Sequence, residues 1–141
     1  MIDKNAVLQF IKSQDLCILS TASKSGKTES AVMAFATDDD IVIYMSTENT
    51  TRKFKNLLEN NFVSVIIGGL KNDPSVQLDG NAKVLTGDEA VKGKSFMLSL
   101  HPELKDYFNS PTSMFFIITP AWLRYSDFSQ NPPEVIELSQ F

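Results

Sequence analysis

The sequence predicts a mainly β, α+β protein, in which six antiparallel strands form a closed or nearly closed barrel flanked by helices. Three observations lead to this prediction. Six segments rich in apolar and β-branched residues are mostly joined by short polar turns, which favour antiparallel pairing. These segments show no obvious charged edge, as an open sheet would need. Amphipathic segments with helical spacing lie between or beside them.

The first third of the chain predicts one helix followed by three strands. Asp3 can cap the helix, which ends near Asp15. The buried stripe of this helix consists of Val7, Leu8 and Ile11. The strands and the turns between them are, in order, Leu16–Ala22, Ser23–Lys27, Thr28–Thr37, Asp38–Asp40 and Ile41–Ser46.

The middle of the chain predicts a helix and two further strands. The helix begins near Thr50, with Thr50 or Asn49 as its cap, and ends at Asn60. Its buried face contains Phe54, Leu57 and Leu58. The strands are Phe62–Ile67 and Val76–Val84. A glycine inside the second strand, Gly80, indicates a bulge or a close backbone approach.

The last part predicts helical turns, a final strand and a tail. Thr86–Glu89 matches the capping-box pattern, so a helix begins there and Pro102 opens a further short turn. The inner side chains of this helix are Ala90, Val91, Phe96, Met97 and Leu100. The last strand is Met114–Thr119, continued as Trp122–Phe128 after Pro120 interrupts its ladder. The polar residues from 129 onward form a loosely attached extension.

Composition limits the function. The 141 residues, 43% of which are apolar, predict a single domain with a substantial core. The formal charge of −4 argues against nucleic-acid binding, which needs a basic surface. We expect no membrane span and no signal peptide, and hence a cytoplasmic location, because long apolar runs and a cationic start are missing.

The clearest chemical signal lies where the third strand meets the second helix. Thr51, Arg52 and Lys53 form the first helical turn, and Ser46 and Thr47 precede it. A helix N-terminus offers free N–H groups and favours an anion, whereas cations there oppose the dipole. A bound phosphate would remove this conflict. The alternative interpretation is a solvated surface pair with threonine merely capping the helix.

This stretch and its neighbours resemble the pyridoxamine 5′-phosphate oxidase-like flavoproteins, which bind FMN in a split β-barrel. The resembling segments are Ile43–Ser46, Thr51–Lys53, Leu57–Asn60, Phe62–Val65, Glu29–Phe35, Val76–Gly80 and Pro120–Tyr125. The resemblance covers residues 1–128 and implies a six-stranded antiparallel Greek-key split β-barrel that binds FMN, followed by an extension at 129–141. It also implies a homodimer with FMN at the interface.

The resemblance assigns cofactor contacts residue by residue. Arg52 and Lys53 would bind the FMN phosphate. The residues that would assist them or contact the flavin and its ribityl chain are Ser46, Thr47, Thr51, Ser30, Ala31, Val32, Met33, Gln77 and Trp122. The partner subunit would supply Gln77. Each has a plainer interpretation: Gln77 as a solvent-facing strand residue, Val32 and Met33 as core, and Trp122 as a core or interface anchor.

The expected activity is that of an FMN-dependent oxidoreductase acting on an unidentified small molecule. The basic, histidine-containing C-terminal segment of the vitamin B6 oxidases has no counterpart in the acidic residues 131–141, so oxidation of pyridoxamine phosphate itself is not expected. The alternatives are a flavin-binding stress or sensor module without turnover, the same fold with heme or deazaflavin F420, and a purely structural dimer.

The remaining reactive side chains have structural interpretations. Cys17 lies in an apolar run and is expected to be a small buried hydrophobe. His101 precedes a proline and is expected to be a surface residue at a helix start. One histidine and one cysteine cannot form a conventional zinc site, so no metal is expected.

Overall fold

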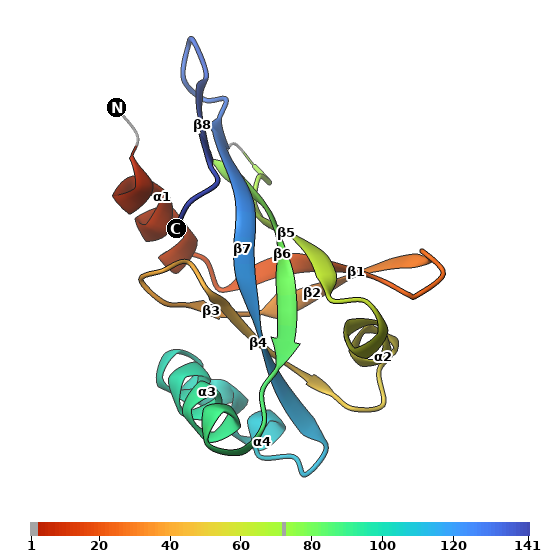
Figure 1. Ribbon diagram of the computed structural model, residues 1–141. Coiled ribbons are helices and arrows are strands. Elements are labelled where there is room, and N and C mark those ends of the chain that lie inside the picture. The colour runs from red at the N-terminus through yellow and green to blue at the C-terminus, as the bar shows by residue number, and fades with distance from the viewer. Residues whose placement is uncertain (1–2, 72) are drawn as a thin grey trace.

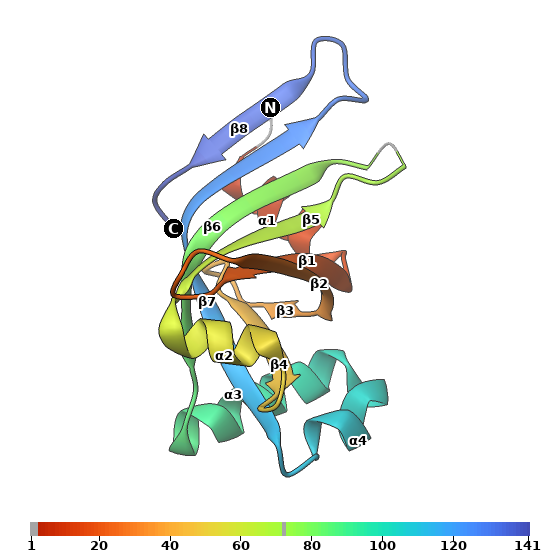
Figure 2. The ribbon, with the colours of Figure 1, turned by 90° about the vertical axis from the view of Figure 1, so that its right-hand side faces the viewer.

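A computed structural model of the chain describes residues 3–71 and 73–141, and it contains one strongly curled antiparallel sheet (Figures 1 and 2). The strand order is β2-β1-β5-β6-β7-β4-β3, with β8 paired to β7. The strands are β1 (Leu16–Ala22), β2 (Thr28–Ala34), β3 (Ala36–Thr37), β4 (Ile43–Glu48), β5 (Phe62–Gly68), β6 (Ser75–Val84), β7 (Ser113–Asp127) and β8 (Glu134–Leu138). The predicted antiparallel split barrel of the α+β class is confirmed.

The helices lie at separate places around the sheet, as Figures 1 and 2 show: α2 beside the β1–β2 end, α3 and α4 together near β4. They are α1 (Lys4–Lys12), α2 (Arg52–Glu59), α3 (Gly87–Leu100) and α4 (Lys105–Phe108), with a short 3-10 turn, η1, at Pro102–Leu104. No helix of the described residues is long and apolar enough to cross a membrane.

The sheet has eight strands where the sequence predicted six. One reason is that the predicted strand Thr28–Thr37 divides at Phe35, whose backbone N–H donates to Asp15 instead of continuing the β1–β2 ladder. The other reason is the tail. It is not loosely attached, because β8 pairs with β7 from Leu123↔Leu138 to Asp127↔Glu134. Ile136 and Leu138 also pack against the main core.

The bulge predicted at Gly80 is present. The β6–β7 register shifts between Asp79 and Gly80, so that Gly80 pairs with Pro120 and Asp79 with Trp122. A Cβ atom at Gly80 would lie 2.5 Å from the carbonyl oxygen of Thr119, so only glycine fits. The sequence predicted that Pro120 interrupts the ladder of this strand. This prediction is wrong, because the bulge accommodates Pro120 and β7 continues through it.

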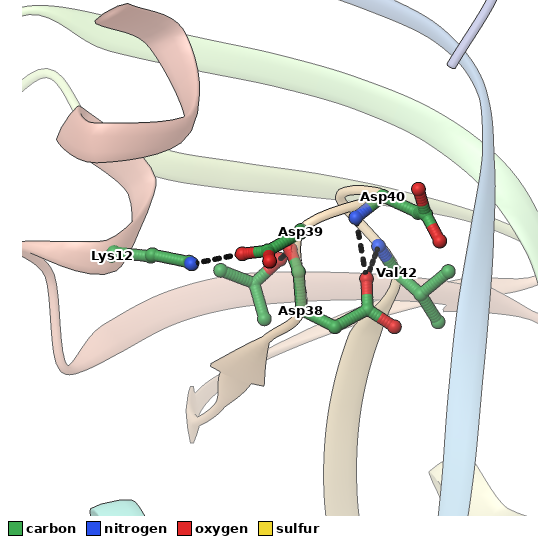
Figure 3. Close-up of polar contacts among 6 residues, drawn as sticks. Lys12, Asp38, Asp39, Asp40 and Val42 are labelled. Carbon is green, nitrogen blue, oxygen red and sulfur yellow. Dashed lines mark hydrogen bonds and ion pairs between the residues drawn. The ribbon is translucent and has the colours of Figure 1, made fainter. Parts of the chain in front are cut away.

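The turn between β3 and β4 is built by aspartates (Figure 3). The Asp38 carboxylate accepts from the backbone N–H groups of Asp40 at 2.9 Å and Val42 at 3.1 Å. Lys12 of α1 pairs with Asp39 at 2.5 Å and ties the turn to the first helix. Ile41 is buried with a φ of +61°, so it belongs to the turn and not to the predicted strand, which begins at Ile43.

Two groups of buried side chains form the core. The larger group fills the curled sheet and includes the α1 residues Val7, Leu8 and Ile11, as predicted. The predicted cap of this helix is also present, since Ala6 N–H donates to the Asp3 carboxylate. The smaller group includes Met97 and Phe108 and lies under α3 and α4. The predicted burial of Leu58, Val91 and Leu100 is wrong, since their side chains are 64%, 64% and 53% exposed.

The capping-box prediction is only partly confirmed. Thr86 is the N-cap residue of α3, but its side chain makes no capping hydrogen bond. Gly87 at the first helical position has a φ of +59°, outside the range of a regular helix start. This irregular entry explains why the helix begins at the predicted place without the predicted reciprocal bonds.

Candidate functional site

The second helix begins one residue later than the sequence predicted. Thr51, rather than Thr50 or Asn49, is the N-cap residue, and its hydroxyl accepts from the Phe54 N–H at 3.3 Å. Arg52 and Lys53 then occupy the first turn, where backbone N–H groups have no acceptor within the helix. No acidic residue lies in this turn. The helix start therefore combines an anion-favouring dipole with two cationic side chains.

The hydroxyl groups beside this helix start are engaged within the protein. Thr47 is fully buried, and its Oγ1 lies 3.0 Å from that of Thr51. Ser46 is buried and bonds the hydroxyl of Ser113 on the neighbouring strand at 2.9 Å. These side chains hold the β4–α2 connection in shape. Their first role is thus to position Arg52 and Lys53.

Arg52 has an internal anionic partner. Its Nε atom lies 3.0 Å from a carboxylate oxygen of Glu29 on β2. The guanidinium side chain is 79% exposed, whereas the Glu29 side chain is only 17% exposed. Both residues line a cavity of about 160 Å³ between the β1–β2 hairpin and α2. Glu29 was not among the predicted site residues, because only the fold brings residues 29 and 52 together.

Other predicted site residues lie on the outer face of the sheet. Paired residues on neighbouring strands point to the same side, and the ladder aligns Val32 with Ile18, Ile18 with Ile66, and Ile66 with Gln77. Burial alternates along β2, β5 and β6, and this row is the exposed one. Val32 is 67% exposed, so its interpretation as core is excluded.

A parallel row on the same face carries polar side chains. Ser30 bonds Ser20 at 2.8 Å, Ser64 donates to Asp79 at 2.8 Å, and Asp79 pairs with Trp122 across the bulge. Trp122 is half-buried on this side. The outer face therefore presents the predicted contacts Ser30, Val32, Gln77 and Trp122 together.

The two remaining predicted residues point inward. Met33 is buried in the main core, and Ala31 packs against that core. They can contact a ligand in the split of the barrel only along the backbone of β2, which is an edge strand. The predicted set thus divides into an outer-face group and a helix-start group, with β2 between them.

The outer face is also apolar over part of its area. A shallow cavity of about 410 Å³ lies there beside the end of α1 and the β5–β6 loop. Its exposed apolar side chains are Leu16, Ile18, Val32, Ile66 and Leu70. A contiguous exposed apolar area of this kind marks an interaction surface on many proteins.

Cys17 and His101 are both buried and contribute to the packing of the fold. Cys17 is buried as expected, and burial raises the pKa of its thiol to about 12, which disfavours the reactive thiolate. The expectation that His101 is a surface residue is wrong, since it is 5% exposed. Its Nε2 donates to the Phe35 carbonyl oxygen at 2.7 Å, and Glu103 lies 3.3 Å from Nδ1. His101 thus joins the end of α3 to the β2–β3 connection.

Comparison with solved structures finds the same fold in several proteins. The chain is 25% identical to the general stress protein 26 of Bacillus anthracis, with 96% of this chain and 98% of that chain covered and a TM-score of 0.72. A Clostridium acetobutylicum protein related to general stress protein 26, of the pyridoxine phosphate oxidase family, is 16% identical, with 98% and 96% covered and a TM-score of 0.73.

A third similar structure is described as a heme storage protein. It comes from Vibrio cholerae and is 16% identical, with 85% of this chain and 91% of that chain covered and a TM-score of 0.72. At this identity the likeness concerns the fold alone.

No curated protein matches the chain. Its sequence does match a model of a protein family. Residues 4–127, which span all but the last strand of the sheet, match the pyridoxamine 5′-phosphate oxidase family. The chain therefore belongs to the pyridoxamine 5′-phosphate oxidase family.

Proposed function

We propose that this protein binds FMN and acts as a flavin-dependent oxidoreductase on a small molecule. The observation that carries the proposal is the pair Arg52–Lys53 in the first turn of α2, within a chain of this family. Arginine can bond two phosphate oxygens at once, and lysine adds a point charge. The exposed guanidinium of Arg52 is accessible to a ligand from solvent.

The residues of this site fit a phosphorylated flavin. Arg52, Lys53 and the free N–H groups of the helix start would hold the phosphate, with Thr47 and Thr51 fixing the cap beneath them. The backbone of β2 from Ser30 to Met33 would lie along the ring, because β2 is an edge strand of the sheet formed by the described residues. Bound FMN would supply hydride transfer, while the chain binds and orients the reactants.

A homodimer is part of the proposal. The outer-face group, including Gln77 and Trp122, points away from the interior, whereas the helix-start group lies at the end of β4. A second copy that covers the apolar outer face would add its own outer-face residues to the site. The exposed side chains Leu16, Val32 and Leu70 support such an interface.

Heme is the second candidate ligand, because a similar fold occurs in a heme storage protein. His101, the one histidine of the sequence, would have to leave the Phe35 carbonyl to bind iron. That rearrangement would leave a buried backbone acceptor without its partner, at a cost of about 1–3 kcal/mol. FMN binding would use the exposed guanidinium of Arg52 and would take no partner from a buried backbone group, so we favour it.

The test is titration of the purified chain with FMN, followed by flavin absorbance and fluorescence, with heme titrated in parallel. Removing one cation by Arg52→Ala or Lys53→Ala should weaken FMN binding by about 2 kcal/mol, roughly thirtyfold, through loss of charge-assisted bonds. Lys92→Ala is the control, since this exposed lysine lies on α3 and does not line the cavity of Arg52 and Glu29. A protein that binds heme but takes up no FMN would refute the proposal.

Catalysis is tested separately on the FMN-loaded protein. Bleaching of the flavin by a nicotinamide donor, followed by reoxidation with a small acceptor, would support an oxidoreductase. Bound flavin that no donor reduces would leave a binding module without turnover. Size measurement by light scattering, with Val32→Asp placed on the apolar outer face, tests the dimer, because a buried unpaired carboxylate should separate the copies.

A further inference from the structure

The candidate phosphate site already contains an anion of the protein itself. A carboxylate oxygen of Glu29 lies 3.0 Å from the Nε atom of Arg52. It therefore occupies one of the edges through which a guanidinium can bind two oxygens. The Glu29 carboxylate is largely shielded, whereas the Arg52 side chain is largely exposed. The arginine therefore reaches back from the helix to the strand, and its terminal nitrogens are the groups left for a ligand.

The position of Glu29 follows from the sheet. It alternates with the outward-facing Ser30 along β2 and pairs with the buried Thr21 of β1, so it faces α2. Thr21 in turn accepts from the Asn56 side chain of α2 at 3.1 Å, which holds the helix against the hairpin. The carboxylate is thus held near the helix start by the packing of α2 on β1 and β2.

Charged side chains of both signs surround Glu29 and Arg52. The cavity that Glu29 and Arg52 share is also lined by the cations Lys27 and Lys55 and by the anion Glu59. Of these charged groups, Glu29 is the one in contact with Arg52. A dianionic phosphate on Arg52 would therefore lie close to a fixed negative charge. Either it would share the guanidinium with Glu29 or it would leave that shielded carboxylate without its partner.

We infer that Glu29 is a specificity-determining residue that competes with the ligand phosphate for Arg52 and lowers the affinity for the phosphorylated flavin. This inference rests on the proposed FMN binding. Its consequence is selective: the carboxylate opposes a phosphate dianion but not an uncharged ligand of the same ring system. The ratio of FMN affinity to riboflavin affinity should therefore be smaller than it would be if Arg52 and Lys53 acted without Glu29.

The experiment compares four forms of the full chain, namely the unaltered protein, Glu29→Gln, Glu29→Ala and the matched control Glu59→Gln. Each is titrated with FMN, with riboflavin, and with FMN in competition with inorganic phosphate. Glu29→Gln removes the charge and keeps the shape, and it should tighten FMN binding about tenfold. Riboflavin affinity should change less than twofold, as should FMN affinity in Glu59→Gln. Glu29→Ala is a second variant, and thermal unfolding checks that each variant is folded.

The outcomes separate this inference from the proposed function. Tighter FMN binding in Glu29→Gln, with riboflavin unchanged, supports both. If the unaltered chain binds FMN in an Arg52-dependent way but neither Glu29 variant binds it more tightly, the competition is refuted and the FMN proposal stands. If no form binds FMN, the proposed function fails and this inference fails with it. Equal tightening by Glu59→Gln would also refute a specific role, because net charge alone would explain it.

Discussion

Replacing Thr51 by alanine should be far more costly than the loss of an ordinary helix cap. The Thr51 hydroxyl takes part in three contacts: it accepts from Phe54 N–H at 3.3 Å, donates to the Glu48 carbonyl oxygen at 3.0 Å, and lies 3.0 Å from the Thr47 hydroxyl. Thr47 is fully buried at 0% exposure. Alanine at position 51 would remove the cap and leave the Thr47 hydroxyl without this partner.

The magnitude follows from two contributions. Loss of a threonine cap costs about 1 kcal/mol. A buried hydroxyl left without a partner costs about 1–3 kcal/mol. The free energy of unfolding should therefore fall by about 2–4 kcal/mol in Thr51→Ala. Thr47→Val alone should cost less than about 1 kcal/mol, because Thr51 keeps its contacts with Phe54 and Glu48 and valine matches threonine in shape.

Urea unfolding followed by circular dichroism measures these differences, with Thr51→Ser as the control that retains the hydroxyl. The double variant Thr47→Val/Thr51→Ala removes the stranded hydroxyl as well. It should therefore be no less stable than Thr51→Ala alone, with a coupling energy of about 1–3 kcal/mol, the cost of the unpaired Thr47 hydroxyl. Strict additivity of the two substitutions, or a loss below about 0.5 kcal/mol in Thr51→Ala, would refute the reasoning.

Two further predictions concern the tail and the buried thiol. Ile136→Ser should lower the free energy of unfolding by about 1–2 kcal/mol, because Ile136 packs on the core. The control Val135→Ser should cost less than about 0.5 kcal/mol, because the Val135 side chain is 46% exposed. Equal effects of the two substitutions in urea unfolding would contradict the packing of β8. Burial raises the pKa of the Cys17 thiol from its ordinary value of 9.0 to about 12 in the folded chain. Below pH 9 the thiol is protonated in both states. Above pH 9 it ionises first in the unfolded chain, so the free energy of unfolding falls as the pH rises. Between about pH 9 and 10, the unaltered chain should therefore lose stability more steeply than Cys17→Ala, by at most about 1.4 kcal/mol per pH unit, and parallel slopes would show that Cys17 ionises alike in both states.

Local patterns predicted most of the elements because each pattern has a local physical cause. The cap at Asp3 and the bulge at Gly80 depend on short-range geometry, and both are present in the structure. Predictions failed where distant contacts decide. The tail became a strand because β7 extends to Asp127 and offers it an edge, which no property of residues 129–141 reveals. His101 is buried where its Nε2 donates a hydrogen bond to the distant Phe35 carbonyl oxygen.

For the candidate site, the sequence by itself determined that Arg52 and Lys53 lie in the first turn of α2, because neighbours on a helix are set by local spacing. The cap itself is one residue later than predicted, at Thr51. Only the tertiary structure decided which groups meet there. Strand pairing sets Val32 and Gln77 on one outer face, and the packing of α2 on the β1–β2 hairpin brings Glu29 against Arg52. These contacts join residues far apart in the chain, so no periodicity of the sequence contains them.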